Sequence, residues 1–209
     1  MNLTIHRHLP LVVVSLCTMS LAASADVTIL PVGDSITRGF NGQESYRAEL
    51  VSRLNASACA PITRGSQGSS SFPGLHEGYS GHRADHFLNG FAANPGIDVT
   101  LQTFSAPSDP VDVVLLHIGT NDMIWQQSVS STLNEIDDVI NIIKQDSPSS
   151  RIFLANGVPL YILFDAIADN NNRLDTEANY ANDSDVVLVD VRTGFRPTDM
   201  DTDGIHPTE

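Results

Sequence analysis

This chain is short of basic residues and of long apolar runs. Its 209 residues include 11 Lys and Arg against 25 Asp and Glu, which gives a formal net charge of -14. Because a protein this acidic repels nucleic acids and anionic membrane surfaces, we expect neither as a partner. No apolar run reaches the roughly 20 residues that a membrane-spanning helix needs. The composition therefore argues against nucleic-acid-binding and membrane-spanning proteins.

The first 25 residues have the pattern of a cleaved secretion signal. Arg7 lies in a short basic start, an apolar run covers residues 9–21, and Ala23-Ser24-Ala25 has the small residues of a cleavage site. We expect residues 1–25 to be removed and the protein to be secreted, or periplasmic in a Gram-negative host. Residues 26–209 then have the size of one domain. An uncleaved membrane anchor is the alternative, but the length and flanks of the run argue against it.

Cysteine is scarce as well. Of two cysteines, Cys17 falls in the expected signal and Cys59 is left alone. The sequence therefore predicts no internal disulfide. A lone cysteine is usually a small buried side chain, unless its partner lies in a part of the protein that this sequence does not include.

Apolar runs alternate with helical patterns along the rest of the chain. Buried strands are predicted at residues 27–32, 111–118, 151–155 and 186–190, with a weaker one at 62–64. Helices are predicted around residues 46–54, 83–91, 129–143 and 159–182, the second with Phe91 facing inward. Residues 92–110 contain three prolines and are predicted to be a surface loop. This alternation predicts an α/β fold with a parallel sheet covered on both faces.

Ligands of such sheets bind at the carboxyl ends of the strands, and two polar motifs fall there. Ser35, in "GDSIT", follows the first strand, and Asn121, in "GTND", follows the strand that ends at Ile118. A serine needs a base that takes its proton, and the base must be oriented. His206, in "DGIHP", is the best candidate, because Asp203 lies three residues before it and can reach its ring.

Two further motifs can stabilise a negatively charged oxygen. The Asn121 amide is a suitable donor at a strand end. Gly81, in "EGYSGH", lies in a loop where a backbone N–H can approach a substrate closely. Each motif alone is weak, whereas the order of serine, glycine, asparagine and histidine along one chain is informative.

In these four motifs the sequence resembles the SGNH (GDSL-type) hydrolase superfamily. The resemblance implies a three-layer α/β/α flavodoxin-like fold with a central parallel sheet, and ester hydrolysis without a metal or another cofactor. It implies that Ser35 is the nucleophile, that His206 is the base and that Asp203 orients the base. The oxyanion hole would consist of the Ser35 and Gly81 backbone N–H groups and the Asn121 side chain.

The stretches "ESYRAELVSRL" and "RGSQ…GLHEGYSGHRAD" are similar to carbohydrate esterase family three. That resemblance implies a secreted esterase, expected to be a monomer, that removes acetyl groups from polysaccharides such as acetylated xylan. Family members continue into a helix that packs on the sheet. We therefore expect such a helix beyond Glu209, so that residues 26–209 would be an incomplete domain.

Other functions stay open. One is hydrolysis of another small acyl or lipid ester, although no apolar lid is evident, and another is a non-catalytic carbohydrate-binding protein on the same fold. A third is calcium binding, because residues 199–204 match the start of an EF-hand loop. The glutamate expected at position twelve and a preceding helix are both missing, and Asp203 fits better as the partner of His206.

Residues near the motifs complete the prediction. Tyr79 and His82 flank Gly81 and are candidates to line the substrate pocket. Trp125 follows the Asn121 loop and either stacks on a sugar ring or packs within the fold. Asp34 and Asp122 are expected to tie loops together.

Overall fold

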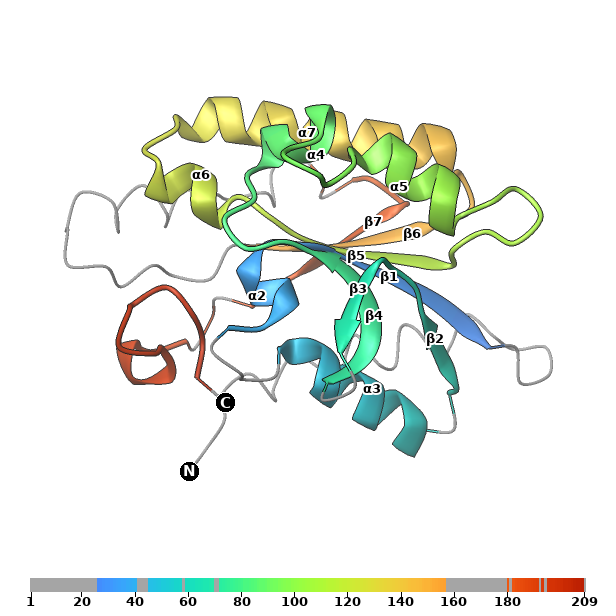
Figure 1. The fold of residues 1–209 in the computed structure, drawn as a ribbon, viewed down its shortest axis with the longest axis horizontal. Coiled ribbons are helices and arrows are strands. Elements are labelled where there is room, and N and C mark those ends of the chain that lie inside the picture. Colours follow the sequence, from blue (N-terminus) through green and yellow to red (C-terminus); the bar gives the residue numbers. More distant parts are fainter. Residues whose placement is uncertain are drawn as a thin grey trace.

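The computed structural model describes most of the chain after residue 25. The described ranges are 26–40, 45–57, 59–69, 72–156, 180, 182–191, 193 and 195–208. Figure 1 shows a central sheet with helices on both of its faces, which confirms the predicted α/β fold. Within these ranges, no helix combines the length and apolar character that a membrane crossing requires.

The sheet is mostly parallel and is centred on the first strand. The strands are β1 Val27–Gly33, β2 Pro61–Thr63, β3 Gln67–Ser69, β4 Phe72–Gly78, β5 Val113–His117, β6 Arg151–Ala155 and β7 Val186–Val189. They lie in the order β3-β4-β1-β5-β6-β7, with β2 beside the first half of β1. Only β3 runs antiparallel to its neighbour among the described strand pairs. The carboxyl ends of β1, β4 and β5 therefore meet at one edge.

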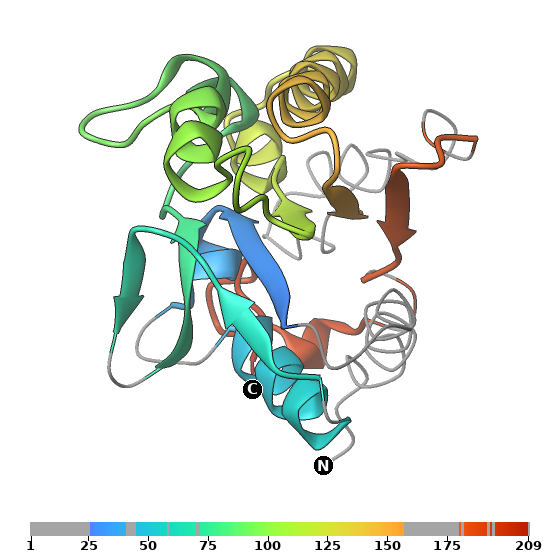
Figure 2. The same cartoon turned by 90° about the vertical axis from the view of Figure 1, so that its right-hand side faces the viewer.

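The helices form two outer layers. They are α2 Ser35–Arg38, α3 Tyr46–Ala56, α4 Ala84–Asn89, α5 Ile97–Phe104, α6 Thr120–Ile124 and α7 Val129–Asp146, followed by a 3-10 turn, Pro197–Asp199. Figures 1 and 2 show α4, α5 and α7 on one face of the sheet and α3 on the other. The longest, α7, begins after Ser128, whose side chain accepts the Ser131 N–H, and ends two residues before Pro148.

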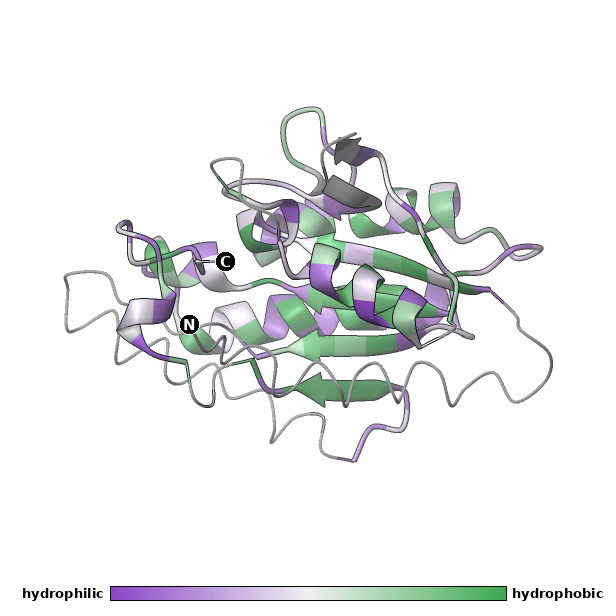
Figure 3. Ribbon diagram, turned by 90° about the horizontal axis from the view of Figure 1, so that it is seen from below, coloured by the Kyte–Doolittle hydropathy of each residue, from purple (hydrophilic) through white to green (hydrophobic). Residues whose placement is uncertain are grey.

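Both faces of the central strands are buried, which explains their continuous apolar sequence. Leu30 on β1 packs in the core under α7, whereas its neighbour Ile29 packs in the core against α3. Figure 3 shows the hydrophobic colouring along the strands and the mixed colouring of the helices. Burying a side chain of this size contributes about 1.5–3 kcal/mol, so the strands anchor the edge that carries the polar motifs.

Two sequence predictions about this region are wrong. Residues 92–110 are not one loop, because α5 occupies Ile97–Phe104 and buries Ile97 and Leu101. Pro95 precedes that helix, and the other two prolines of the segment follow it, so the prolines mark its flanks. Phe91 does not face inward either; it is 51% exposed and lies beyond the end of α4.

Cys59 also departs from the prediction. It takes part in a disulfide bond, so the expectation of no disulfide is wrong for the chain with residues 1–25 present. That expectation depended on removing residues 1–25, and Cys17 lies outside the described residues. Most of the helix predicted over 159–182 lies outside them too and stays a prediction.

Candidate active site

A chain of two hydrogen bonds joins the serine, histidine and aspartate that the sequence singled out. Ser35 is the first residue of α2 and is separated from the end of β1 by Asp34 alone, and Figure 1 shows the C-terminal segment, in red, beside that helix. The Ser35 Oγ lies 2.8 Å from His206 Nε2, and His206 Nδ1 lies 2.6 Å from Asp203 Oδ2. Ser35 and His206 are both buried, at 6% and 7% exposure. The structure thus brings together residues 171 positions apart in the sequence.

A tight turn holds Asp203 and His206 in register. Asp203 Oδ1 accepts the backbone N–H groups of Ile205 and His206, at 2.9 and 3.0 Å, while Oδ2 faces the ring. Gly204 completes the turn with a φ of +67°, which favours glycine. Burial alone would raise the pKa of Asp203, but the hydrogen bonds from His206 and Ile205 outweigh it and hold that pKa below its ordinary value. Asp203 is therefore a carboxylate at neutral pH.

The start of α2 is equally constrained. Asp34 Oδ1 accepts the Ile36 N–H at 2.9 Å, which caps the turn that presents Ser35. A Cβ at Gly33 would lie 2.3 Å from the His117 carbonyl oxygen on β5, so only glycine fits there. Full burial raises the pKa of Asp34 to about 7.

Three groups at this edge of the sheet can donate to an oxyanion. As the first residue of a helical turn, Ser35 has a backbone N–H without an acceptor inside that turn. Gly81 is exposed with a φ of +75°, and a Cβ built on it would meet no atom within 4 Å. Asn121 Nδ2 donates to the His82 carbonyl at 2.9 Å and lies 3.4 Å from Asp34 Oδ2. Because the second contact is long, one amide hydrogen can turn to a substrate oxygen.

Two more contacts fix the glycine loop against its neighbours. Both oxygens of Asp122 accept the Ala84 N–H, at 3.1 and 3.2 Å, and burial raises the pKa of Asp122 to about 6. Arg38 Nη1 donates to Ser80 Oγ at 2.9 Å. The structure thus gives Asp34 and Asp122 contacts that tie loops, as the sequence led us to expect.

Arg47 supports the site and was missed in the sequence. Its guanidinium is buried and donates to three backbone oxygens: Thr37 O at 2.7 Å, Gly74 O at 2.8 Å and Arg38 O at 3.1 Å. Burial lowers its pKa. It joins the end of α2 to β4. An arginine on the inward side of an otherwise amphipathic helix was the signal that could have revealed it.

The three candidate substrate residues differ in placement. Tyr79 is buried, donates its hydroxyl to Glu77 and has a pKa that burial raises to about 12. The His82 ring is buried against Phe87, and burial lowers its pKa to about 4, so it is neutral. Trp125 is 71% exposed, and its backbone N–H donates to the Asn121 carbonyl at 2.9 Å. Of the three, Trp125 offers an open aromatic face near the site.

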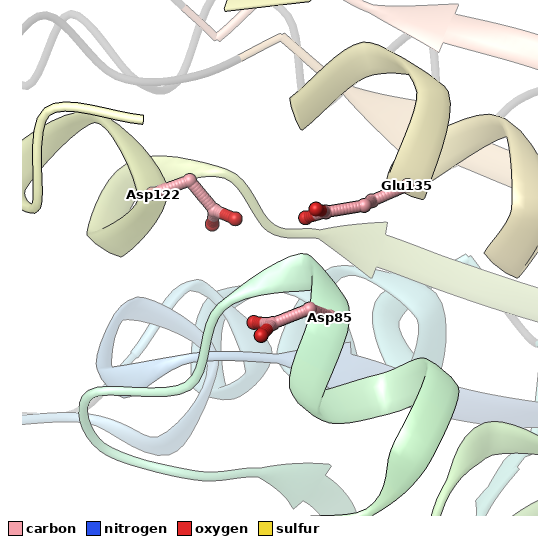
Figure 4. A group of neighbouring side chains, drawn as sticks. All are labelled: Asp85, Asp122 and Glu135. Atoms are coloured by element: carbon pink, nitrogen blue, oxygen red, sulfur yellow. The ribbon is translucent and has the colours of Figure 1, made fainter. Parts of the chain in front are cut away.

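One group of carboxylates in the described part of the chain has the spacing of a cation site. Figure 4 shows Asp85, Asp122 and Glu135 pointing toward one another, and their ligand atoms lie within 4.8 Å. Protein donors already reach all three. Arg83 Nη2 donates to Asp85 at 2.7 Å, the Ala84 N–H donates to Asp122, and a glutamine side chain donates to Glu135 at 2.8 Å. Each of the three carboxylates therefore already accepts a hydrogen bond from the protein.

The segment that begins like an EF-hand makes other contacts. Asp199 forms an ion pair with Arg196 at 3.1 Å, and Asp201 accepts the Thr202 N–H. Asp203 holds His206, as described above. Each carboxylate therefore serves a different local partner.

Comparisons with known proteins agree with this geometry. The family model of the GDSL-like lipase/acylhydrolase family matches residues 32–209. A multidomain esterase of Ruminococcus flavefaciens is 25% identical over 92% of this chain, which spans only 29% of that protein's length.

Two solved structures have the same fold. A family 3 carbohydrate esterase of Clostridium thermocellum is 28% identical with a TM-score of 0.69, and the match covers 88% of this chain and 89% of that one. A carbohydrate esterase of family 3 from Talaromyces cellulolyticus, 19% identical, also has a TM-score of 0.69, over 87% and 88% of the two chains. The predicted resemblance to this superfamily, and within it to carbohydrate esterase family three, is confirmed.

Proposed function

Because the chain belongs to the GDSL-like lipase/acylhydrolase family and is a carboxylic ester hydrolase, we propose that it removes acetyl groups from plant cell-wall polysaccharide such as acetylated xylan. The observation that carries the proposal is the hydrogen-bonded chain from Ser35 through His206 to Asp203. The 28% identity to a family 3 carbohydrate esterase over most of both chains supports the substrate class.

The reaction begins with transfer of the Ser35 proton. His206 Nε2, 2.8 Å from Oγ, takes that proton while Oγ attacks the acetyl carbonyl carbon. Asp203 faces Nδ1 and stabilises the imidazolium that forms. The negative charge that develops on the carbonyl oxygen is held by the N–H groups of Ser35 and Gly81 and by the Asn121 amide, a role worth several kcal/mol in such sites.

The tetrahedral intermediate then collapses. The sugar oxygen leaves with the proton that His206 held, and an acetyl-serine remains. Water, deprotonated by His206, attacks the acetyl carbon, and acetate leaves as Ser35 recovers its proton. In this proposal Trp125, which is exposed and one helical turn from Asn121, stacks its ring on a sugar of the substrate.

The test is acetate release from acetylated xylan by the full chain. Ser35→Ala is the matched variant, and Ser130→Ala, which changes an exposed serine on α7, is the control. We expect release by the wild type and by Ser130→Ala, and none by Ser35→Ala. Full activity of Ser35→Ala would overturn the serine mechanism.

The same proteins are assayed on 4-nitrophenyl acetate, butyrate and octanoate. Activity on the octanoate above that on the acetate, with none on xylan, would favour the alternative of a lipid or other acyl ester. Binding to xylan without hydrolysis of any ester would favour the non-catalytic carbohydrate-binding alternative.

We further propose that residues 1–25 are cleaved on secretion and that the protein acts as a monomer. The intact mass of the exported protein measures the cleavage, and sedimentation equilibrium measures the monomer. An exported mass that still includes residues 1–25 would contradict the first.

A further inference from the structure

We propose that Phe40 is a positioning residue that holds the His206 ring in its working plane. The two rings stack with their centroids 3.7 Å apart and their planes 1° from parallel. The inference rests on the proposed function, because it assigns Phe40 a role in the reaction of Ser35 and His206. The sequence motifs gave no indication of it.

The stack is built by the same turn that presents the nucleophile. Gly39 follows α2 with a φ of +91°, and its N–H donates to the Ser35 carbonyl at 2.8 Å. Because its φ is positive, Gly39 redirects the chain so that Phe40 lies over His206. The Arg47 guanidinium holds the carbonyl groups of Thr37 and Arg38 in this turn. Nucleophile and stacking ring are therefore parts of one hydrogen-bonded turn.

The hydrogen bonds to His206 leave one motion that Phe40 restricts. Asp203 binds Nδ1 and Ser35 binds Nε2, so the two bonds define a line across the imidazole. Tilting about that line keeps both contacts short but spoils their alignment, and hydrogen bonds weaken as they depart from linearity. A flat ring at 3.7 Å blocks the tilt on one side.

Phe40 also covers one face of the base. The negative π-face of an aromatic ring attracts a cation placed over it. The imidazolium that forms when His206 takes the Ser35 proton is such a cation. Phe40 therefore favours the charged transition state more than the resting state, and its loss should lower kcat rather than raise KM.

The chain contains a matched control for this effect. Phe91 stacks on His86 with centroids 4.0 Å apart and planes 6° from parallel, the same arrangement on a histidine that Ser35 does not contact. Phe91→Leu and Phe40→Leu thus remove the same kind of contact, but only Phe40 contacts the catalytic base. Phe40→Tyr keeps the aromatic face.

The experiment measures kcat and KM on 4-nitrophenyl acetate for these three variants of the full chain. Because misplacing a catalytic group is costly, we expect Phe40→Leu to lower kcat on the order of tenfold, with KM within about twofold. Phe40→Tyr should restore most of the loss, and Phe91→Leu should match the wild type. An unchanged kcat in Phe40→Leu, an effect on KM alone, or an equal loss in Phe91→Leu would overturn the proposal.

A second measurement does not depend on turnover. In the proton NMR spectrum, the ring current of Phe40 should shift the His206 ring protons upfield in the wild type and in Phe40→Tyr, and Phe40→Leu should abolish that shift. Absence of the shift in the wild type would overturn the stack itself. If the shift is present but no variant hydrolyses any ester, the proposed function fails while the stacking geometry stands.

Discussion

Asp203→Asn tests the proposed mechanism with a change of one atom. Asp203 uses Oδ1 for two backbone N–H groups and Oδ2 for the His206 ring. Asparagine can keep a carbonyl oxygen at the first position, so the turn survives. It then places an NH2 group against His206 Nδ1, which must become an acceptor. The ring proton moves to Nε2, and a protonated Nε2 cannot take the Ser35 proton.

The size of the effect follows from that change of tautomer. We expect kcat/KM to fall about 10³- to 10⁴-fold, or roughly 4–5.5 kcal/mol of transition-state stabilisation. The free energy of unfolding should change far less. One charge-assisted hydrogen bond becomes a neutral one, which costs about 1 kcal/mol, and the two bonds to the backbone remain.

Asp203→Ala is the companion variant. It removes the ring contact and also the acceptor of two backbone N–H groups, so it should lose as much activity and additionally lower the free energy of unfolding by about 1–3 kcal/mol. Both variants are assayed on 4-nitrophenyl acetate and by thermal unfolding. If Asp203→Asn kept more than a tenth of wild-type kcat/KM while folding normally, Asp203 would not control the tautomer and the mechanism would need another orienting group.

Three further predictions concern the supports of the site. Asn121→Ala should lower kcat about 10²- to 10³-fold with a small effect on KM, measured on the same ester. Arg47→Lys should lower the free energy of unfolding by about 2 kcal/mol or more, since an ammonium cannot span three carbonyl groups; a melting temperature equal to wild type would contradict this. Because burial raises the pKa of Asp34 to about 7 and that of Asp122 to about 6, the folded chain holds protons that the unfolded chain releases. The contribution of these two carboxyls to stability should therefore fall as the pH rises from about 4 to 7, whereas buried histidines such as His82, whose pKa lies near 4, act in the opposite direction. The test is therefore the difference in melting temperature between the wild type and Asp34→Asn: the wild type should lose stability relative to the variant as the pH rises over this range, and a constant difference would refute the assignment.

The sequence located the reacting residues because each lies at a place that topology determines. Ser35 and Asn121 follow strands that are apolar on both faces, and such strands are parallel neighbours in a covered sheet. Their meeting at one edge follows from the fold class alone. The pairing of Asp203 with His206 is local, because a three-residue turn brings them together. The order of the motifs along the chain was therefore enough to predict that these residues form one site.

The supporting residues could not be found in the same way. Phe40 meets His206 across 166 positions, and Arg47 reaches a carbonyl on β4, so both roles depend on contacts that no local pattern encodes. Helix α5 was missed for a different reason. Its flanking prolines suggested a loop, and eight residues are too few to decide the period. Ile97, Leu101 and Phe104 have helical spacing, but Ile97, Val99 and Leu101 also alternate as they would in a strand.

At the catalytic edge of the sheet, the segments after the strands and the C-terminal segment that carries His206 are held by different contacts. Three segments, after β1, β4 and β5, are tied together by groups that do not react: Asp122 holds the Ala84 N–H, and Arg38 holds Ser80. The segment of residues 195–208 is internally bonded, as between the Asp201 N–H and the His206 carbonyl. It meets the nucleophile turn through His206 itself, by the Ser35 hydrogen bond and the Phe40 stack. The alignment of the base therefore depends on contacts made by the catalytic ring, so a change at Phe40 should reach kcat more directly than a change at Asp122 or Arg38, which tie the other loops.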